Sequence, residues 1–308
     1  MRPVRPTYRV VVPALLAAVS ILASVSTASA SSIVAVKTSP RIEFSPASNA
    51  GFFMWSQNSS AHPKHFDAFI QHGGGGATKM NANGSFGYAG GISSDGSTAV
   101  FQQVTNGKSD IELYDIATHT VSAPSQGVNT RRWEWGPTID GNYLLFARND
   151  QTSTFPPDEI VLYDLGTHVS TVLATNGSRK GYTQSGQISG DFAVYENCSA
   201  RVCNVFRYQI STQTTIKLPN PHDKVNYGAS VDTSGTVFYG RSGVGCGTHA
   251  RLLKWAPGDL TPTTLFTPPV GQDFTSTFTE TTVGGDELFF DRVKCSNQSW
   301  DIYKIVDP

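Results

Sequence analysis

The sequence predicts an all-β protein, a six-bladed β-propeller, and two observations support this prediction. A glycine recurs at a nearly constant interval, with spacings of 45, 45, 49, 45 and 50 residues, and each interval holds only short apolar or aromatic runs separated by turns. A period near 45 residues with strand-like segments alone is typical of one four-stranded blade per repeat. The recurring glycines are Gly51, Gly96, Gly141, Gly190, Gly235 and Gly285.

The second repeat shows the expected order of strands most clearly. Residues 88–96 form an inner strand that ends in an Asp-Gly turn, and residues 97–103 form the second strand. After an Asn-Gly turn, a third strand is expected over 110–115 and a short outer strand over 118–122. Asp-Gly and Asn-Gly favour the positive backbone dihedral angles of two-residue hairpins, so the turns agree with the strand pattern.

The other repeats follow the same order, and the two ends of the chain complement each other. The last repeat stops at Pro308 after its third strand, and the segment 32–37 is a strand candidate without a partner in the first repeat. Pairing the two would close the ring and remove an exposed sheet edge, whereas an open solenoid is the alternative. The expected blades cover roughly 39–83, 86–124, 131–174, 181–218, 226–266, and 273–308 plus 32–37.

The motifs of these repeats resemble those of TolB-type, or WD40-like, propellers. The shared elements are a Ser-x-Asp-Gly turn, an apolar strand, a Gly or Asn turn and an Asp-Ile-x-x-Tyr-Asp strand, clearest in the second and third repeats. The resemblance extends over about 270 residues. It implies a propeller that acts as a binding platform, and it carries no catalytic residues over to this chain.

The first thirty residues have the pattern of a signal peptide. Arg2, Arg5 and Arg9 precede an apolar stretch over 10–25, and an Ala-Ser-Ala sequence ends at Ala30. A membrane anchor is the alternative, but the apolar stretch is short for a spanning helix. We therefore expect cleavage after residue 30, a propeller over 31–308 with no membrane insertion, and a secreted protein that is extracellular or periplasmic.

The charge and the cysteine content narrow the class of protein and its expected location further. The net charge is −1 and 15% of the residues are charged, which leaves no basic footprint for nucleic acid. The chain is expected to be a monomer. Four cysteines in a secreted chain indicate disulfides, and the expected pairs are Cys198–Cys203 within one hairpin and Cys246–Cys295 between neighbouring blades. A metal site is the alternative, although the chain has no Cys-x-x-Cys pair.

Aromatic residues recur at the start of the expected inner strands. Four of them precede the repeat glycine by eight residues, and the others lie nearby. Around one mouth of the central channel, such side chains would bind a protein, peptide or glycan ligand. The alternative is that they pack between adjacent sheets. The predicted ligand-binding residues are Tyr88, Trp133, Trp135, Tyr182, Tyr227 and Phe274.

The competing hypothesis is an enzyme. Six-bladed lactonases and related hydrolases hold a metal, usually calcium, in the channel with single residues from different blades, so no local motif would reveal them. The candidate ligands here are Glu43, Glu134, Asp273 and Glu280. The chain has no Gly-x-Ser-x-Gly nucleophile motif. No catalytic residue and no cofactor are therefore assigned, and calcium is the metal that the alternative would use.

Three histidines, His62, His65 and His72, flank the third strand of the first blade, with Asp67 between them. Imidazole suits zinc and copper, which makes a metal site conceivable. Because no helix aligns these residues, a solvated loop is the preferred interpretation. The four glycines over 73–76 follow a strand and lack the Lys and Ser/Thr of a phosphate loop, so they are interpreted as a flexible turn.

Overall fold

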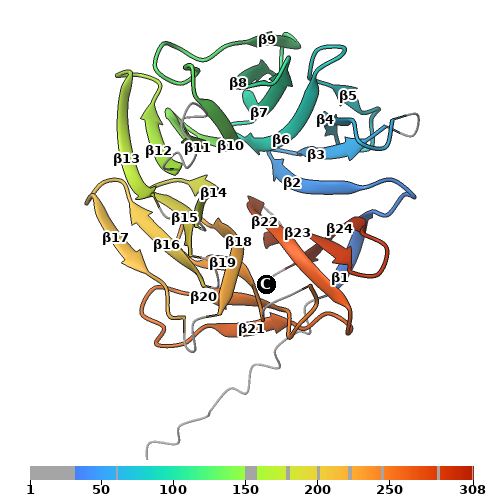
Figure 1. The fold of residues 1–308 in the computed structure, drawn as a ribbon, viewed down its shortest axis with the longest axis vertical. Helices are drawn as coiled ribbons and strands as arrows, with labels where there is room; N and C mark the ends of the chain where they lie inside the picture. Colours follow the sequence, from blue (N-terminus) through green and yellow to red (C-terminus); the bar gives the residue numbers. More distant parts are fainter. Residues whose placement is uncertain are drawn as a thin grey trace, which may run out of the picture. The chain divides into compact units, whose positions relative to one another are not determined.

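Every regular element in the described part of the protein is a β-strand, as the repeats predict (Figure 1). The computed structural model describes residues 32–59, 62–149, 158–177, 181–199, 202–220, 224–243, 246–282, 285–306 and 308. The expected signal peptide, residues 1–30, lies outside these ranges. Within the ranges, no helix is long and apolar enough to cross a membrane.

Three sheets are antiparallel meanders of four strands that follow the chain order. The first consists of β2 (Glu43–Asn49), β3 (Phe52–Asn58), β4 (Phe66–His72) and β5 (Thr78–Lys79). The second consists of β6 (Phe86–Ile92), β7 (Thr98–Thr105), β8 (Lys108–Asp115) and β9 (Thr120–Ser122). The third consists of β10 (Trp133–Asp140), β11 (Tyr143–Asn149), β12 (Asp158–Asp164) and β13 (Val169–Asn176).

A fourth four-stranded sheet combines the two ends of the chain. It consists of β22 (Gln272–Thr282), β23 (Gly285–Lys294), β24 (Ser299–Val306) and β1 (Ile33–Lys37), in that order. β1 pairs antiparallel with β24, from Ile33 opposite Ile305 to Lys37 opposite Ile302. The segment 32–37, predicted to pair with the third strand of the last repeat, therefore forms the outer strand of this sheet.

The remaining strands depart from the expectation of six separate blades, because four blades are separate and eight strands form one continuous sheet. A single parallel bridge between Cys203 and Val225 joins the two halves of this sheet. The Asn220 amide donates to the carbonyls of both Cys203 and Lys224, which holds the two strand starts together. The strands are β14 (Tyr182–Ser189), β15 (Phe192–Cys198), β16 (Cys203–Gln209), β17 (Thr214–Lys217), β18 (Val225–Val231), β19 (Val237–Ser242), β20 (Arg251–Trp255) and β21 (Thr263–Phe266).

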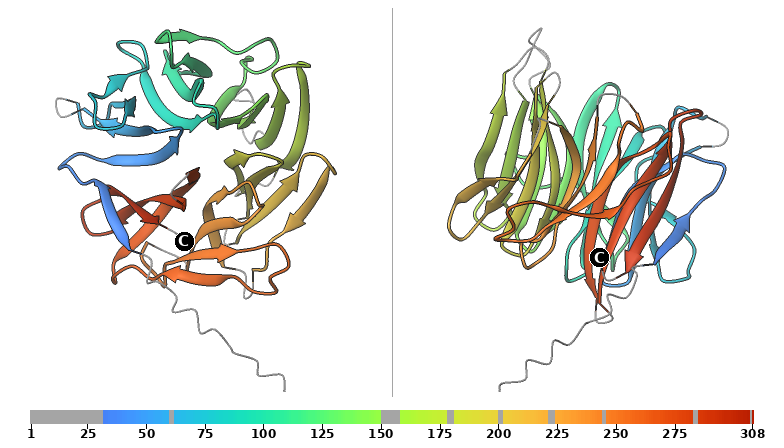
Figure 2. Two further views of the ribbon diagram at one scale, coloured as in Figure 1. Left: turned by 180° about the vertical axis from the view of Figure 1, so that it is seen from behind. Right: turned by 90° about the horizontal axis from the view of Figure 1, so that it is seen from below.

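The sheets follow one another around a central axis, as Figures 1 and 2 show. The strands β2, β6, β10, β14, β18 and β22 each contact the next in this order, and β22 contacts β2. These six strands are called the inner strands below. This cyclic arrangement confirms the propeller fold.

The hydrophobic core lies between neighbouring sheets. Val100 and Ile111 of the second sheet pack in one cluster with Leu144 and Phe146 of the third, and all four side chains are fully buried. Burying one large aliphatic or aromatic side chain contributes about 2 kcal/mol, so each interface between sheets is strongly stabilising.

Both predicted disulfides are present. Cys198–Cys203 closes the hairpin between β15 and β16, and Cys246–Cys295 has a Cα–Cα distance of 5.8 Å. Cys246 lies between β19 and β20, and Cys295 follows β23, so the second bond joins two different sheets.

A β-bulge interrupts every inner strand at the same level. The register with the following strand shifts in all six pairings, for example between Ala89 and Gly91 and between Tyr227 and Ser230. A bulge leaves the backbone groups of its extra residue outside the ladder, so they need other partners.

Side chains of a neighbouring sheet, or of another strand of the eight-stranded sheet in the case of Glu196, supply partners for these groups. The Ser56 hydroxyl accepts the Ala89 amide at 2.8 Å, Glu196 accepts the Ala229 amide at 3.3 Å, and Asp291 accepts the Ser45 amide at 3.2 Å. In the other direction, three hydroxyls donate to bulge carbonyls of an adjacent inner strand. They are Ser185 to Gly136, Thr138 to Gly186, and Thr277 to Gly228.

Among these partners, the carboxyl of Glu196 is strongly affected by burial. Burial raises the pKa of its carboxyl from 4.5 to about 8, although the amides of Ala229 and Gly228 lower it by hydrogen bonding. The folded protein therefore keeps this proton at pH values where the unfolded chain has lost it. Stability falls as pH rises from about 4.5 to about 8, and the contribution is on the order of a few kcal/mol.

We predict that Glu196→Gln flattens the pH dependence of stability. The amide keeps an acceptor for the Ala229 amide and does not ionise, so the variant should lose less stability than the parent between pH 5 and 8. Thermal melts of both proteins at several pH values measure this difference. Parallel curves for the two proteins would show that Glu196 does not titrate in this range.

We predict that Gly90→Ala destabilises the fold. A methyl group on Gly90 would overlap the carbonyl oxygens of Pro137 and Val100, which belong to two different sheets. The expected cost is about 2 kcal/mol, since neither backbone segment can move freely. Urea denaturation checks this, with Gly76→Ala as control because no atom lies within 4 Å of the added methyl there. Equal midpoints for the two variants would contradict the prediction.

Candidate functional site

Three of the six predicted ligand-binding aromatics line one groove of about 380 Å³, called the aromatic groove below. Tyr88 lies on β6, and Trp133 and Trp135 lie on β10 of the next sheet. Residues two apart on a strand point to the same face, which explains why both tryptophans reach the groove. The full lining consists of Phe86, Tyr88, Gln102, Val104, Trp133 and Trp135.

The tryptophan wall is fixed by polar contacts on both sides. The Trp135 indole N–H donates to the side-chain carbonyl of Gln184, on the next inner strand, at 3.1 Å. Just before β10, Arg132 pairs with Glu159 at 2.7 Å, and the same carboxylate binds Arg148 at 3.1 Å. These contacts hold the start of β10 against the body of its sheet.

The opposite wall is supported by other aromatic rings. Tyr88 packs in tilted geometry against Phe44 and Phe66, with ring centroids 6.3 and 6.0 Å apart. Burial raises the pKa of the Tyr88 hydroxyl, so it remains protonated and can donate a hydrogen bond at neutral pH. Phe86 stacks on His65 with centroids 4.7 Å apart.

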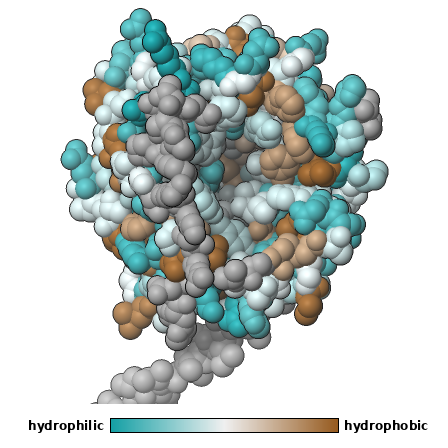
Figure 3. Space-filling model, in the orientation of Figure 1, coloured by the Kyte–Doolittle hydropathy of each residue, from teal (hydrophilic) through white to brown (hydrophobic). Residues whose placement is uncertain are grey.

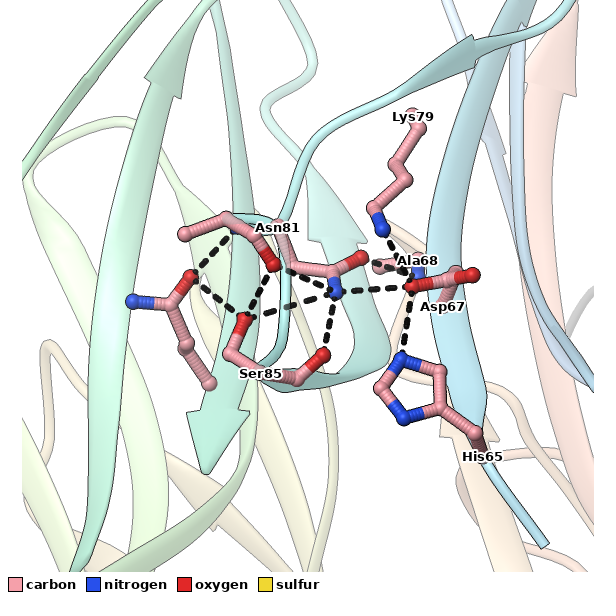
Figure 4. A network of polar contacts seen from close by, with 8 residues as sticks. His65, Asp67, Ala68, Lys79, Asn81 and Ser85 are labelled. Carbon is pink, nitrogen blue, oxygen red and sulfur yellow. Dashed lines mark hydrogen bonds and ion pairs between the residues drawn. The ribbon is translucent and has the colours of Figure 1, made fainter. Parts of the chain in front are cut away.

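A polar network holds the loop that leads into this wall (Figure 4). The Asp67 carboxylate pairs with the Lys79 ammonium group at 2.8 Å and with the His65 ring at 3.3 Å. It also accepts a hydrogen bond from the Asn81 amide at 2.9 Å. Asn81 also accepts the Ala68 amide and donates to the Ser85 carbonyl. Asn81 therefore ties β4 to the segment that precedes Phe86, and the Lys79 and Asn81 contacts lower the pKa of Asp67 against the effect of its burial.

The other three predicted aromatic residues, Tyr182, Tyr227 and Phe274, do not line the aromatic groove. Tyr182 is 44% exposed at the start of β14, two residues before Gln184. Tyr227 donates its hydroxyl to the Asp273 carboxylate, and burial together with that carboxylate raises its pKa well above the ordinary value. Phe274 is 2% exposed and packs against Phe266 and Phe290. The inner strands thus do not present one continuous aromatic ring, and Phe274 belongs to the core.

Three of the four candidate calcium ligands are engaged separately, and the fourth, Glu280, lines a different cavity. Glu43 accepts hydrogen bonds from Ser39, and Glu134 accepts equivalent bonds from Thr130. Asp273 binds Tyr227 and the Gly247 amide. Within the described ranges, no three His, Cys, Asp or Glu side chains form a cluster that could hold a metal ion.

The central channel holds a smaller cavity of about 200 Å³ at the level of the bulges. Its lining comes from all six inner strands, for example Gly90, Thr138 and Thr277, and includes Glu196 from β15. Two small residues of the inner strands, Gly136 and Ser185, also line this cavity. Glu196 is the one ionisable side chain among the described residues that line this cavity.

Sequence reasoning missed the polar residues that position the groove. Asn81, Asn129, Asn176 and Asn220 precede successive inner strands, and each bonds backbone groups of a nearby strand. For Asn176, at the end of β13, that strand is β15 of the next sheet. The spacings of the four asparagines, 48, 47 and 44 residues, were a usable signal. The channel position of Glu196 had no such signal, because the equivalent residues in other blades differ in type.

The face drawn in Figure 3 has a hollow near its centre. Apolar residues occur there in small groups separated by polar ones.

Neither a protein-family model nor a curated protein matches this sequence. Solved structures match the fold. The putative TolB from Agrobacterium tumefaciens is 13% identical with a TM-score of 0.59, over 90% of this chain and 98% of that one. TolB from Acinetobacter baumannii is 12% identical with a TM-score of 0.55, over 84% of this chain and 64% of that one.

An oligogalacturonate lyase in complex with manganese is 11% identical with a TM-score of 0.56, over 87% of this chain and 90% of that one. At such low identities, these likenesses show the fold alone. The described residues have the fold of TolB-type β-propellers, as the repeat motifs indicate.

Proposed function

We propose that this protein is a secreted, non-enzymatic binding platform that holds a protein, peptide or glycan segment in the aromatic groove. The main support for this proposal is that Tyr88, Trp133 and Trp135 line one groove between two sheets. Flat aromatic faces beside the Gln102 amide suit sugar rings and peptide side chains, which combine apolar faces with hydrogen-bonding groups.

In this proposal the propeller has six blades. The eight-stranded sheet acts as two blades, β14–β17 and β18–β21, because one bridge alone connects them. The pairing of β1 with β24 supports closure of the ring by the N-terminal strand. Removal of residues 1–30 as a signal peptide would leave the propeller over 31–308, and the two disulfides suit a periplasmic or extracellular location.

The second candidate function is a hydrolase or lyase that works in the channel. It is favoured by the protonated Glu196 carboxyl in the channel cavity and by fold neighbours that include the lyase and a prolyl endopeptidase. Calorimetric titration of the propeller with calcium and manganese, followed by assays on lactones and oligogalacturonate, tests this function. Turnover that Glu196→Gln abolishes would favour the enzyme.

We predict that Trp133→Ala lowers ligand affinity at least tenfold. The fluorescently labelled propeller, residues 31–308, is applied to a glycan array and a peptide array, and the best hit is titrated by calorimetry. Truncation of a central interface tryptophan typically costs 2 kcal/mol or more. Val121→Ala, at an exposed position on β9, is the matched control and should bind as the parent does. Equal affinities of Trp133→Ala and the parent, or no hit on either array, would overturn the proposal.

A further inference from the structure

A further cavity lies at the opposite ends of the inner strands from the aromatic groove. It has a volume of about 760 Å³ and is called the distal pocket below. Phe86 and Trp133 of the groove begin β6 and β10, whereas the distal pocket is lined by Ser94 after β6, Ser189 at the end of β14 and Thr233 after β18. Its volume is in the range of small-molecule sites in proteins.

One wall of the distal pocket is aromatic. Phe52 and Phe53 from β3 and Phe289 from β23 line it. Phe53 and Phe289 are in tilted contact with ring centroids 5.5 Å apart, and Phe53 stacks on Trp55 at the same distance. These contacts fix Phe53 and Phe289, so the wall is already in place before a ligand arrives.

The charges in the distal pocket do not balance. Its charged lining residues are Glu280, Glu287 and Lys304. Lys304 pairs with Glu287 at 2.6 Å, which neutralises both groups. Glu280 is 7% exposed and has no ion pair among the described residues. A buried carboxylate without a counter-ion is costly, and a cation from outside would remove that cost.

The surroundings of Glu280 favour an organic cation. Burial and the nearby Glu287 raise the pKa of this carboxyl, while Ser48, Gly51 and Lys304 lower it. Gly51 is adjacent to Phe52, so an aromatic face and a carboxylate lie on neighbouring parts of one pocket. Aromatic faces attract ammonium groups, and a carboxylate adds a charge-assisted hydrogen bond.

We propose that the distal pocket binds a small organic amine, with its ammonium group at Glu280 and its apolar body against Phe52, Phe53 and Phe289. The hydroxyls of Ser94, Ser189 and Thr233 lie across the mouth and suit a body that carries hydroxyl groups. This site is separate from the aromatic groove and does not depend on the function proposed for the groove.

Three probes of one size test the charge preference: phenethylamine, 2-phenylethanol and phenylacetate. Saturation-transfer NMR titrations of the propeller, residues 31–308, measure each dissociation constant. Phenethylamine should bind at least tenfold more tightly than the neutral alcohol or the anion. Equal binding of the alcohol, or no binding of any probe, would overturn the proposal.

Two variants locate the binding. Glu280→Gln removes the charge and keeps the size of the side chain, so phenethylamine binding should weaken at least tenfold. Ser94→Trp occupies the mouth from an exposed turn and should block the amine without altering Glu280. Unchanged binding in both variants would overturn the proposal. Trp133→Ala lies in the aromatic groove and should bind phenethylamine as the parent does, which separates this test from that of the groove.

Discussion

The bulge in each inner strand is the constraint on which the rest of the structure depends. Six backbones converge on one axis, and every bulge leaves amides and carbonyls that its own sheet does not pair. Ser56, Glu196 and Asp291 accept some of these amides from strands β3, β15 and β23. The sheets are therefore joined at the axis by directional bonds as well as by apolar packing, and this fixes their angular order.

Much of the fold was predictable because its signals are local. Turn chemistry and strand alternation depend on neighbours in sequence, and five of the six repeat glycines adopt the positive φ that such turns require: Gly51, Gly96, Gly141, Gly190 and Gly235. The bridge that merges eight strands was not predictable, because it depends on how closely Cys203 and Val225 approach in space. Pairing of Cys246 with Cys295 was predictable since both follow equivalent strands in adjacent repeats.

The candidate site was only partly predictable from the sequence, because it also depends on which strands lie side by side in space. The position eight residues before the repeat glycine is equivalent in every blade, yet Tyr88 and Trp133 line a groove while Tyr227 is bonded to Asp273. The residue opposite the aromatic side chain on the next strand decides whether it lines a groove or bonds to another side chain. Gly240 leaves space directly against the Tyr227 ring, whereas Gln102 occupies the corresponding place beside Tyr88. Such pairings become visible only when strands are placed side by side.

The pairing of β1 with β24 also affects how the protein folds. Ile33 and Ile305 are opposite each other although 272 residues separate them, so this sheet is completed only after nearly the whole chain is available. Contacts of such long range form late and slowly, because the intervening chain must first be ordered. Until then, β22–β24 have an unpaired edge, and that edge can pair with strands of other copies. The last sheet is therefore where misassembly would begin.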